Sequence, residues 1–167
     1  MLILGIDPGF AITGYSIIKY EKNNFKLLDC GAVNTKAGTP LPERLKCIYD
    51  KVTELIELYN PDFVSIEELF FNQNVKTAIG VAQGRGAVLV ASAKANKEIF
   101  EYTPLQVKQA VVGYGRADKK QVQQMVKTIL KLDSVPKLDD ITDAMAVAIC
   151  HAHSYKVLNK YIDKVKG

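Results

Sequence analysis

The order of the apolar runs is the feature that most constrains how this chain can fold. Three strand-like runs come first, over residues 2–7, 14–20 and 25–35, and the polar turn 21–24 separates the last two. Strands joined by connections this short pair in an antiparallel manner. The beginning of the chain is therefore expected to form a meander.

Strand-like and helical patterns follow one another in the rest of the chain. Two further strands are expected, at residues 62–67 and 98–103. Helices are expected at residues 41–59, 75–95, 105–112, 119–132 and from near 138. This order predicts an α/β domain with a mixed five-stranded sheet, in which three antiparallel strands come first and the later strands return by right-handed crossovers.

Two acidic residues fall within or directly after apolar strands. Asp7 follows the run Leu2-Ile3-Leu4-Gly5-Ile6, and Glu67 lies in Phe63-Val64-Ser65-Ile66-Glu67-Glu68; neither run contains Lys or Arg. A buried carboxylate is costly unless a cation neutralises it. Oxygen ligands of this kind suit a divalent metal such as Mg²⁺. Metal-assisted chemistry is therefore the first hypothesis.

A second acidic pair, Asp140 and Asp143, lies in the last expected helix. A spacing of three residues stacks both carboxylates on one face of a helix. If the first and fourth strands pair, these acids would join Asp7 and Glu67 and hold two metals about 4 Å apart. The alternatives are that the pair belongs to the first turn of its helix and that Asp7 forms a turn before Pro8-Gly9.

The excess positive charge lies in one segment next to this pair. Residues 94–137 carry nine Lys/Arg and four Asp/Glu, a balance of +5, whereas residues 1–93 balance at −1 and residues 138–167 at zero. A basic segment beside an acidic metal site is what an enzyme that cuts phosphodiesters needs. A solvated helix face explains the same charges equally well.

Composition indicates one domain and an intracellular setting. A chain of 167 residues with 48% hydrophobic residues can bury a full core without disulfides or metal. The apolar stretches are too short to span a membrane, and the start of the chain lacks the features of a signal peptide. The three cysteines, Cys30, Cys47 and Cys150, show neither a disulfide framework nor zinc-finger spacing. A cytoplasmic protein is expected.

Several short stretches match one known pattern, in order and with close spacing. They are Leu4-Gly5-Ile6-Asp7-Pro8-Gly9 with Thr13-Gly14-Tyr15, Ile66-Glu67, Gln83-Gly84-Arg85-Gly86, Glu101-Tyr102, Gln106-Val107-Lys108-Gln109 with Val111-Val112-Gly113, Lys119 with Gln121-Val122-Gln123, residues 140–144, and His151 with His153. Through them the chain resembles the RuvC-type Holliday junction resolvases of the ribonuclease H-like superfamily. The likeness covers a nuclease domain over residues 1–155 and leaves a basic C-terminal tail, residues 156–167.

The resemblance implies a homodimeric, Mg²⁺-dependent crossover junction endodeoxyribonuclease, with Mn²⁺ able to substitute. Such an enzyme nicks two opposing strands of four-way junction DNA in recombination and repair, together with a branch-migration complex of RuvA-type and RuvB-type proteins. Position by position, the resemblance makes Asp7, Glu67, Asp140 and Asp143 the catalytic, metal-binding acids. Glu68 competes for the role of Glu67, because alternate strand side chains face opposite ways and only one can face the metals.

The resemblance also implies contacts with DNA. Lys108 and Lys119 match family lysines near the scissile strand, and Phe70 matches an aromatic side chain inserted at the crossover, although a core position for Phe70 is the alternative. Lys120, at a helix start where the dipole disfavours a cation, and Arg116, on a glycine-flanked loop, are expected to bind phosphates.

Two other functions compete with this interpretation. Asp7-x-Gly9 with Thr13-Gly14 also resembles the phosphate loop of actin-like ATPases and sugar kinases, but 167 residues leave no room for their second lobe. A non-catalytic DNA-binding module would leave the four acids unexplained, because carboxylates repel phosphates unless metal intervenes.

Two symmetric cuts require a two-fold dimer, and the glycine-containing helix at residues 75–95 is expected at or near its interface.

The histidines near the end of the chain raise a separate question. Cys150-His151-Ala152-His153 contains metal-binding residue types, but His151 lies about 12 Å beyond Asp143 along the same helix. A structural or DNA-proximal role is therefore expected for His151.

Overall fold

The chain contains five strands and five helices within the part that the structure describes. This computed structural model describes the backbone of residues 1–9, 11–68 and 75–166, and the side chains of the same residues except 75–77 and 156–166. The elements are β1 (Leu2–Asp7), β2 (Ile12–Glu21), β3 (Asn24–Asn34), α1 (Leu41–Tyr59), β4 (Phe63–Glu67), α2 (Val75–Lys94), β5 (Glu98–Tyr102), α3 (Pro104–Val112), α4 (Lys119–Leu130) and α5 (Asp139–Lys166).

The strands form one mixed sheet in the order β3-β2-β1-β4-β5. The pairs β1/β2 and β2/β3 are antiparallel, whereas β1/β4 and β4/β5 are parallel. The prediction of three antiparallel strands followed by parallel ones is confirmed. In the parallel pair of β1 and β4, Ile6 lies opposite Ile66, so Asp7 and Glu67 follow at the same edge of the sheet.

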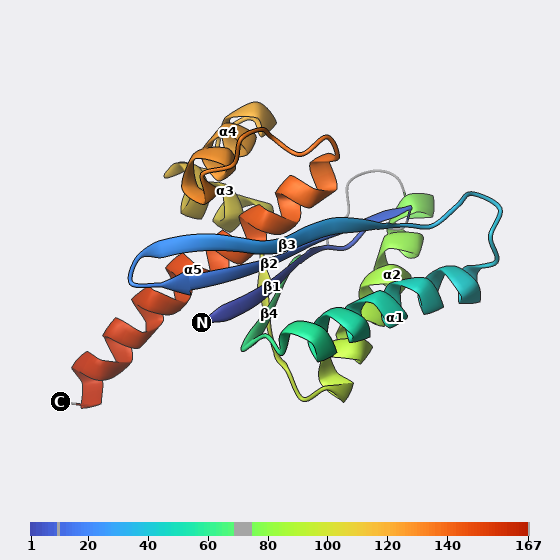
Figure 1. The fold of residues 1–167 in the computed structure, drawn as a ribbon, viewed down its shortest axis with the longest axis horizontal. Helices are drawn as coiled ribbons and strands as arrows, with labels where there is room; N and C mark the ends of the chain where they lie inside the picture. Colours follow the sequence, from blue (N-terminus) through green and yellow to red (C-terminus); the bar gives the residue numbers. More distant parts are fainter. Residues whose placement is uncertain (10, 69–74, 167) are drawn as a thin grey trace.

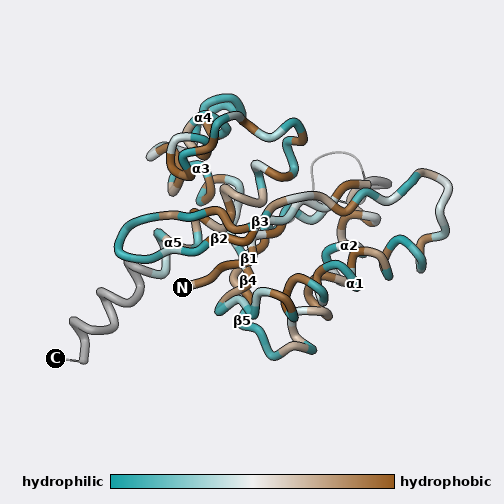
Figure 2. Tube along the Cα trace, in the orientation of Figure 1, coloured by the Kyte–Doolittle hydropathy of each residue, from teal (hydrophilic) through white to brown (hydrophobic). Residues whose placement is uncertain are grey.

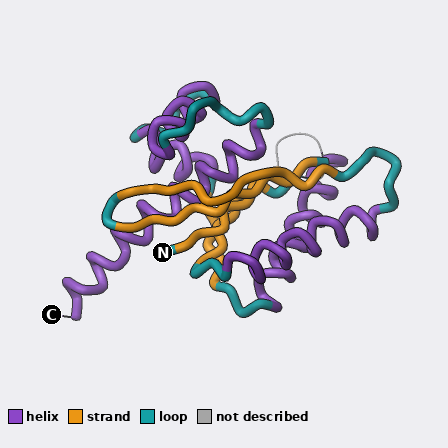
Figure 3. Tube along the Cα trace, in the orientation of Figure 1, coloured by secondary structure: helices purple, strands orange, loops and turns teal. Residues whose placement is uncertain are grey.

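Helices cover both faces of this sheet. Figures 1 and 3 show α1 and α2 together on one side, with α3 and α4 on the other. The apolar strand residues, brown in the centre of Figure 2, divide between two cores. Leu4 and Ile6 pack with α1 and α2, and Ile3 packs with α3, α4 and α5. Because strand side chains alternate between faces, Asp7 points to the α5 side.

Two glycines let α5 lie against the middle of the sheet. A Cβ atom at Gly5 would overlap the carbonyl oxygen of Ala144, and a Cβ atom at Gly14 would overlap that of Asp140. In addition, Ser16 Oγ donates a hydrogen bond of 3.1 Å to the Ala144 carbonyl. The first turns of α5 therefore rest directly on β1 and β2. This close approach carries the acidic residues of α5 to the sheet.

Several element boundaries differ from the expected ones by one or two residues, each for a local reason. The fourth strand begins at Phe63 because the Asp62 carboxylate turns back to accept a hydrogen bond of 2.6 Å from the Leu2 amide. Helix α3 begins at Pro104, after a capping box in which Thr103 accepts from the Gln106 amide. Helix α4 ends at Leu130, since Lys131 adopts φ 53° and closes it in the left-handed conformation.

The remaining differences concern α2 and the end of the chain. A Cβ atom at Gly84 would lie 3.4 Å from Ile48 Cδ1, whereas one at Gly86 would meet no atom of the described residues within 4 Å. Packing against the described residues therefore does not account for Gly86. The segment 156–166, expected as a tail, continues α5 as helix to Lys166 and extends beyond the sheet (Figure 1). Within the described residues, none of the helices has the length and apolar character that crossing a bilayer demands.

Candidate active site

Four acidic side chains converge on the face of the sheet that α5 covers. Asp7 ends β1 and Glu67 ends the neighbouring β4, and both alternate with residues of the opposite core, so they face α5. Asp140 and Asp143 come from the first turns of α5, where the sheet glycines bring them close. The structure therefore places the four residues predicted from the sequence on one face of the sheet, at the ends of β1 and β4 and the start of α5.

Neighbouring carboxyl groups influence the pKa values of Asp7 and Glu67. Burial raises the pKa of Asp7 to about 8, and the charges of Glu67, Asp143 and Asp140 act in the same direction. Burial likewise raises the pKa of Glu67 to about 7, with a further contribution from Asp143 that Lys108 and Lys119 oppose. These shifts reflect carboxylates forced together away from water, which a bound cation would relieve.

The third raised carboxyl group has a cation beside it. Burial raises the pKa of Asp143, although the nearby ammonium of Lys119 opposes that rise. Lys119 Nζ lies 3.3 Å from Asp143 Oδ2 and 3.0 Å from Asp139 Oδ2. In the described part of the chain, no three His, Cys, Asp or Glu side chains are gathered tightly enough to hold a metal ion as they stand. Holding one therefore requires the carboxylates to draw together.

The donor set nevertheless fits a hard divalent cation. All four side chains offer carboxylate oxygens, the ligands that Mg²⁺ and similar ions prefer, without the sulfur or imidazole donors typical of zinc. The raised pKa values of Asp7 and Glu67 show that their negative charge lacks full compensation. Asp7, Glu67, Asp140 and Asp143 are therefore the residues that would hold the metal.

A cavity of about 220 Å³ opens beside these acids, and opposite charges meet in it. It is lined by Glu67, Pro104, Val107, Lys108, Lys119, Val122, Asp143 and Ala146. Asp7 and Asp140 are not among the lining residues. Two lysines expected to contact DNA, Lys108 of α3 and Lys119 of α4, thus lie at the acidic site itself. The cavity can accept an anionic group between carboxylates and ammonium groups once the carboxylates are neutralised.

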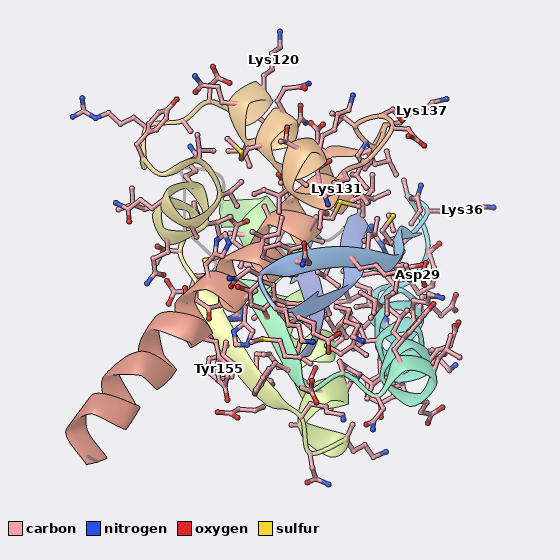
Figure 4. The ribbon with its side chains drawn as sticks, turned by 60° about the vertical axis from the view of Figure 1, so that its left-hand side comes forward. Asp29, Lys36, Lys120, Lys131, Lys137 and Tyr155 are labelled. Carbon is pink, nitrogen blue, oxygen red and sulfur yellow. The ribbon has the colours of Figure 1, made fainter. Side chains whose placement is uncertain are left out.

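The other expected DNA contacts that the structure describes, Arg116 and Lys120, are not among the residues that line this cavity. Arg116 is exposed in the segment between α3 and α4. Lys120 is exposed on α4, and Figure 4 shows it projecting away from the rest of the protein. Phe70 lies outside the residues that the structure describes. Asp118 caps α4: its carboxylate accepts a hydrogen bond of 2.9 Å from the Gln121 amide, so that Lys119 starts the helix.

The choice between the two adjacent glutamates follows from strand alternation. Glu67 faces α5 and lines the cavity, whereas Glu68 is exposed and its amide donates a hydrogen bond of 2.8 Å to the Tyr102 carbonyl beyond the end of β4. This geometry favours Glu67 as the ligand.

His151 lies in the core, away from the acids. Its side chain is fully buried, and its Nδ1 atom lies 2.8 Å from the hydroxyl of Tyr102. The centroid of its ring lies 4.9 Å from the ring centroid of Phe63 and 4.5 Å from that of Phe100. Burial lowers the pKa of His151 to about 4, so it is neutral at physiological pH. This environment supports a structural role.

Asp139 lies beside the site although it was not among the residues predicted from the sequence. It lies in the first turn of α5, and its carboxylate also contacts Lys119 of α4. The contact between Lys119 and Asp139, which are 20 residues apart, is not visible in local sequence patterns. The adjacent doublet of Asp139 and Asp140 was the available signal.

The mixed sheet, the helix that lies across it and the four carboxylates at its edge define the class of ribonuclease H-like nucleases. The profile of the family described as Crossover junction endodeoxyribonuclease RuvC matches residues 3–151. The chain belongs to this family. It is 65% identical to the Crossover junction endodeoxyribonuclease RuvC of Alkaliphilus oremlandii over 92% of this chain and 94% of that one.

Solved structures agree with this assignment. Thermus thermophilus RuvC has 36% sequence identity, a TM-score of 0.88, and coverage of 94% of this chain and 96% of that one. Thermus thermophilus RuvC in complex with a Holliday junction substrate has 35% identity and a TM-score of 0.90 over the same shares of the two chains. The fold class and the family expected from the sequence are thereby confirmed.

Proposed function

We propose that this chain resolves four-way DNA junctions by hydrolysing one phosphodiester bond in each of two opposing strands, with Mg²⁺ held by Asp7, Glu67, Asp140 and Asp143. The observation that carries the proposal is the convergence of these four carboxylates at the edge of the sheet, with the pKa values of Asp7 and Glu67 raised. Family membership and the junction complex of the Thermus thermophilus relative support the same substrate.

The chemistry of the site follows from its side chains. A pair of Mg²⁺ ions held by Asp7, Glu67, Asp140 and Asp143 would supply an activated water and would neutralise the leaving oxygen of an in-line displacement. The four carboxylates must be deprotonated to act as ligands. Since the pKa of Asp7 is about 8 and that of Glu67 about 7, metal binding near neutral pH releases protons. Cleavage is therefore expected to rise as the pH increases from 6 to 8.

The lysines at the cavity would position the DNA. Lys108 and Lys119 line the cavity together with Glu67 and Asp143, so a phosphate that meets the carboxylate-bound cations would also meet two ammonium groups. Arg116 and Lys120 extend this positive surface outward, where they would hold phosphates further along the strand. We assign Phe70 to the junction crossover on the resemblance alone.

A homodimer would deliver the second cut. Ile79 and Val90 of α2 are 56% and 58% exposed, respectively, and their spacing of eleven residues, about three turns, places both on one face of the helix. Gly86 lies between them in sequence, and a Cβ atom there would meet no atom of the described residues within 4 Å. Exposed apolar side chains and a glycine on one helix favour α2 as a two-fold interface.

We further propose that RuvA-type and RuvB-type branch-migration proteins present the junction and that the protein acts on chromosomal DNA in the cytoplasm.

The decisive experiment is cleavage of a synthetic four-way junction with Mg²⁺ by the wild-type protein and Asp7→Asn. We expect paired, symmetric nicks from the wild type and at least about a thousandfold slower cleavage by the variant, since the site loses one ligand of the cations that stabilise the transition state. Junction binding should persist in the variant. Glu68→Gln is the matched control, because it removes an exposed carboxylate next to Glu67 and should leave cleavage unchanged.

Two results would contradict this proposal. Cleavage by Asp7→Asn at the wild-type rate would exclude Asp7 as a ligand. Equal cleavage of linear duplex and four-way junction by the wild type would show that the substrate is not the junction.

A further inference from the structure

Asp139, which is not one of the four expected ligands, contacts the lysine at the active site. Its Oδ2 atom lies 3.0 Å from Lys119 Nζ, and its Oδ1 atom accepts a hydrogen bond of 2.8 Å from Gln123 Nε2. The same Lys119 Nζ atom lies 3.3 Å from Oδ2 of Asp143. Two carboxylates of α5 therefore share one ammonium group, and only one of them, Asp143, belongs to the expected metal site.

The contact aligns one face of α4 with one face of α5. Lys119 and Gln123 are four residues apart on α4, and Asp139 and Asp143 are four residues apart on α5, so each pair presents both side chains to the same side. Asp139 is held from two points, by the ammonium group and by the amide of Gln123. Both carboxylate oxygens of Asp139 therefore have a partner on α4.

The two carboxylates differ in their depth. The side chain of Asp143 is 32% exposed, whereas those of Asp139 and Lys119 are 53% and 52% exposed. Asp143 belongs to the cavity lining and Asp139 does not. Lys119 thus stands between an inner carboxylate at the cavity and an outer carboxylate toward solvent. An ammonium group and a divalent cation on the same carboxylate repel each other, so Lys119 and metal compete for Asp143.

We propose that Asp139 is a positioning residue that shares the ammonium group of Lys119 with Asp143. This sharing weakens the hold of Lys119 on Asp143, so that a divalent cation displaces it more easily, and keeps Lys119 at the cavity for a DNA phosphate. This inference rests on the proposed function, in which Asp143 is a metal ligand. Without Asp139, the ion pair that Lys119 keeps among the described residues is the one with Asp143, and a divalent cation must displace it.

The test is the affinity of the full-length, DNA-free protein for Mn²⁺ at pH 8, measured by isothermal titration calorimetry. Asp139→Asn should weaken Mn²⁺ binding by about two- to fivefold, the range that a half-exposed ion pair can supply. In a Lys119→Met background the same Asp139→Asn change should have no measurable effect, because no ammonium group remains to be drawn away. Asp139→Glu, which keeps the carboxylate, should restore affinity in part or fully.

A matched control removes a carboxylate from a similar ion pair elsewhere. Asp50 Oδ2 lies 2.5 Å from Lys46 Nζ in an exposed ion pair on α1. Because this pair involves neither Lys119 nor the four acids, Asp50→Asn should leave Mn²⁺ affinity unchanged. Thermal unfolding of each variant separates a structural role from a positioning role. A loss of stability in Asp139→Asn with unchanged Mn²⁺ affinity would overturn the proposal.

Two further results decide the matter. Equal weakening by Asp139→Asn with and without Lys119 would overturn the proposal, since Asp139 would then act through its own charge or as a ligand. The calorimetric titration of Asp7→Asn separates this inference from the proposed function. If Asp7→Asn loses Mn²⁺ binding while Asp139→Asn does not, the role of Asp139 is refuted and the proposed metal site stands. If Asp7→Asn binds Mn²⁺ as the wild type does, the proposed metal site itself is refuted.

Discussion

Replacement of Asp7 by Asn should make the metal-free protein more stable while it removes activity. Burial and three neighbouring carboxylates raise the pKa of Asp7 from 3.8 to about 8. Because the folded pKa lies above the unfolded one, folded protein binds this proton more tightly than unfolded protein does. The group therefore costs no stability below pH 3.8, and its cost grows as the pH rises from there to about 8.

The size of the effect follows from that shift. About four pKa units at about 1.4 kcal/mol each give an upper limit of about 6 kcal/mol. Ionised carboxylates move apart and admit water, which lowers the cost, so we expect about 3 kcal/mol at pH 8. For a domain of this size, that corresponds to an increase in Tm of about 6–12 °C. The advantage of Asp7→Asn should shrink steadily as the pH falls toward 4.

Differential scanning calorimetry in EDTA, at several pH values between 5 and 8, measures the effect. Glu68→Gln serves as the control, because it removes a neighbouring carboxylate that is exposed to water and should shift Tm little. Added Mg²⁺ should raise the Tm of the wild type and should raise that of Asp7→Asn much less. A Tm of Asp7→Asn at or below that of the wild type at pH 8 in EDTA would refute the electrostatic argument.

Three other changes test the packing, the assembly and the acid stability. Gly14→Ala should destabilise the fold by about 1–3 kcal/mol and reduce junction cleavage, because its Cβ would push the Asp140 carbonyl away from β2; thermal unfolding and the cleavage assay check both effects. Val90→Lys on the exposed face of α2 should shift the protein toward monomer in sedimentation velocity, and an unchanged dimer would exclude that face. His151 should cost stability as the pH falls from 6.5 toward 4, by up to about 3 kcal/mol, because the unfolded chain gains a proton that the buried ring resists; urea unfolding should show a weaker acid dependence for His151→Gln.

Local patterns in the sequence were sufficient to predict the order and approximate bounds of the strands and helices. The first strand, Leu2–Asp7, and the first helix, Leu41–Tyr59, have the predicted bounds, because apolar periodicity and the flanking Pro8 and Asn60-Pro61 act over a few residues. The later boundaries shifted where a side chain or a backbone angle closed the element, as at Lys131. The family and the four acids were also available from the sequence, since they rest on residue types in order.

The packing that brings the four acids to one face of the sheet is visible only in the tertiary structure. Glu67 rather than Glu68 faces the site because of the side of the sheet that α5 covers, and Gly5 and Gly14 permit that contact. The sharing of Lys119 between Asp139 and Asp143 depends on the packing of α4 beside α5. Residue types and spacing thus determined which groups can act in this protein. Packing between distant elements determined which of them meet, because side-chain contacts depend on where helices rest and not on local conformational preference.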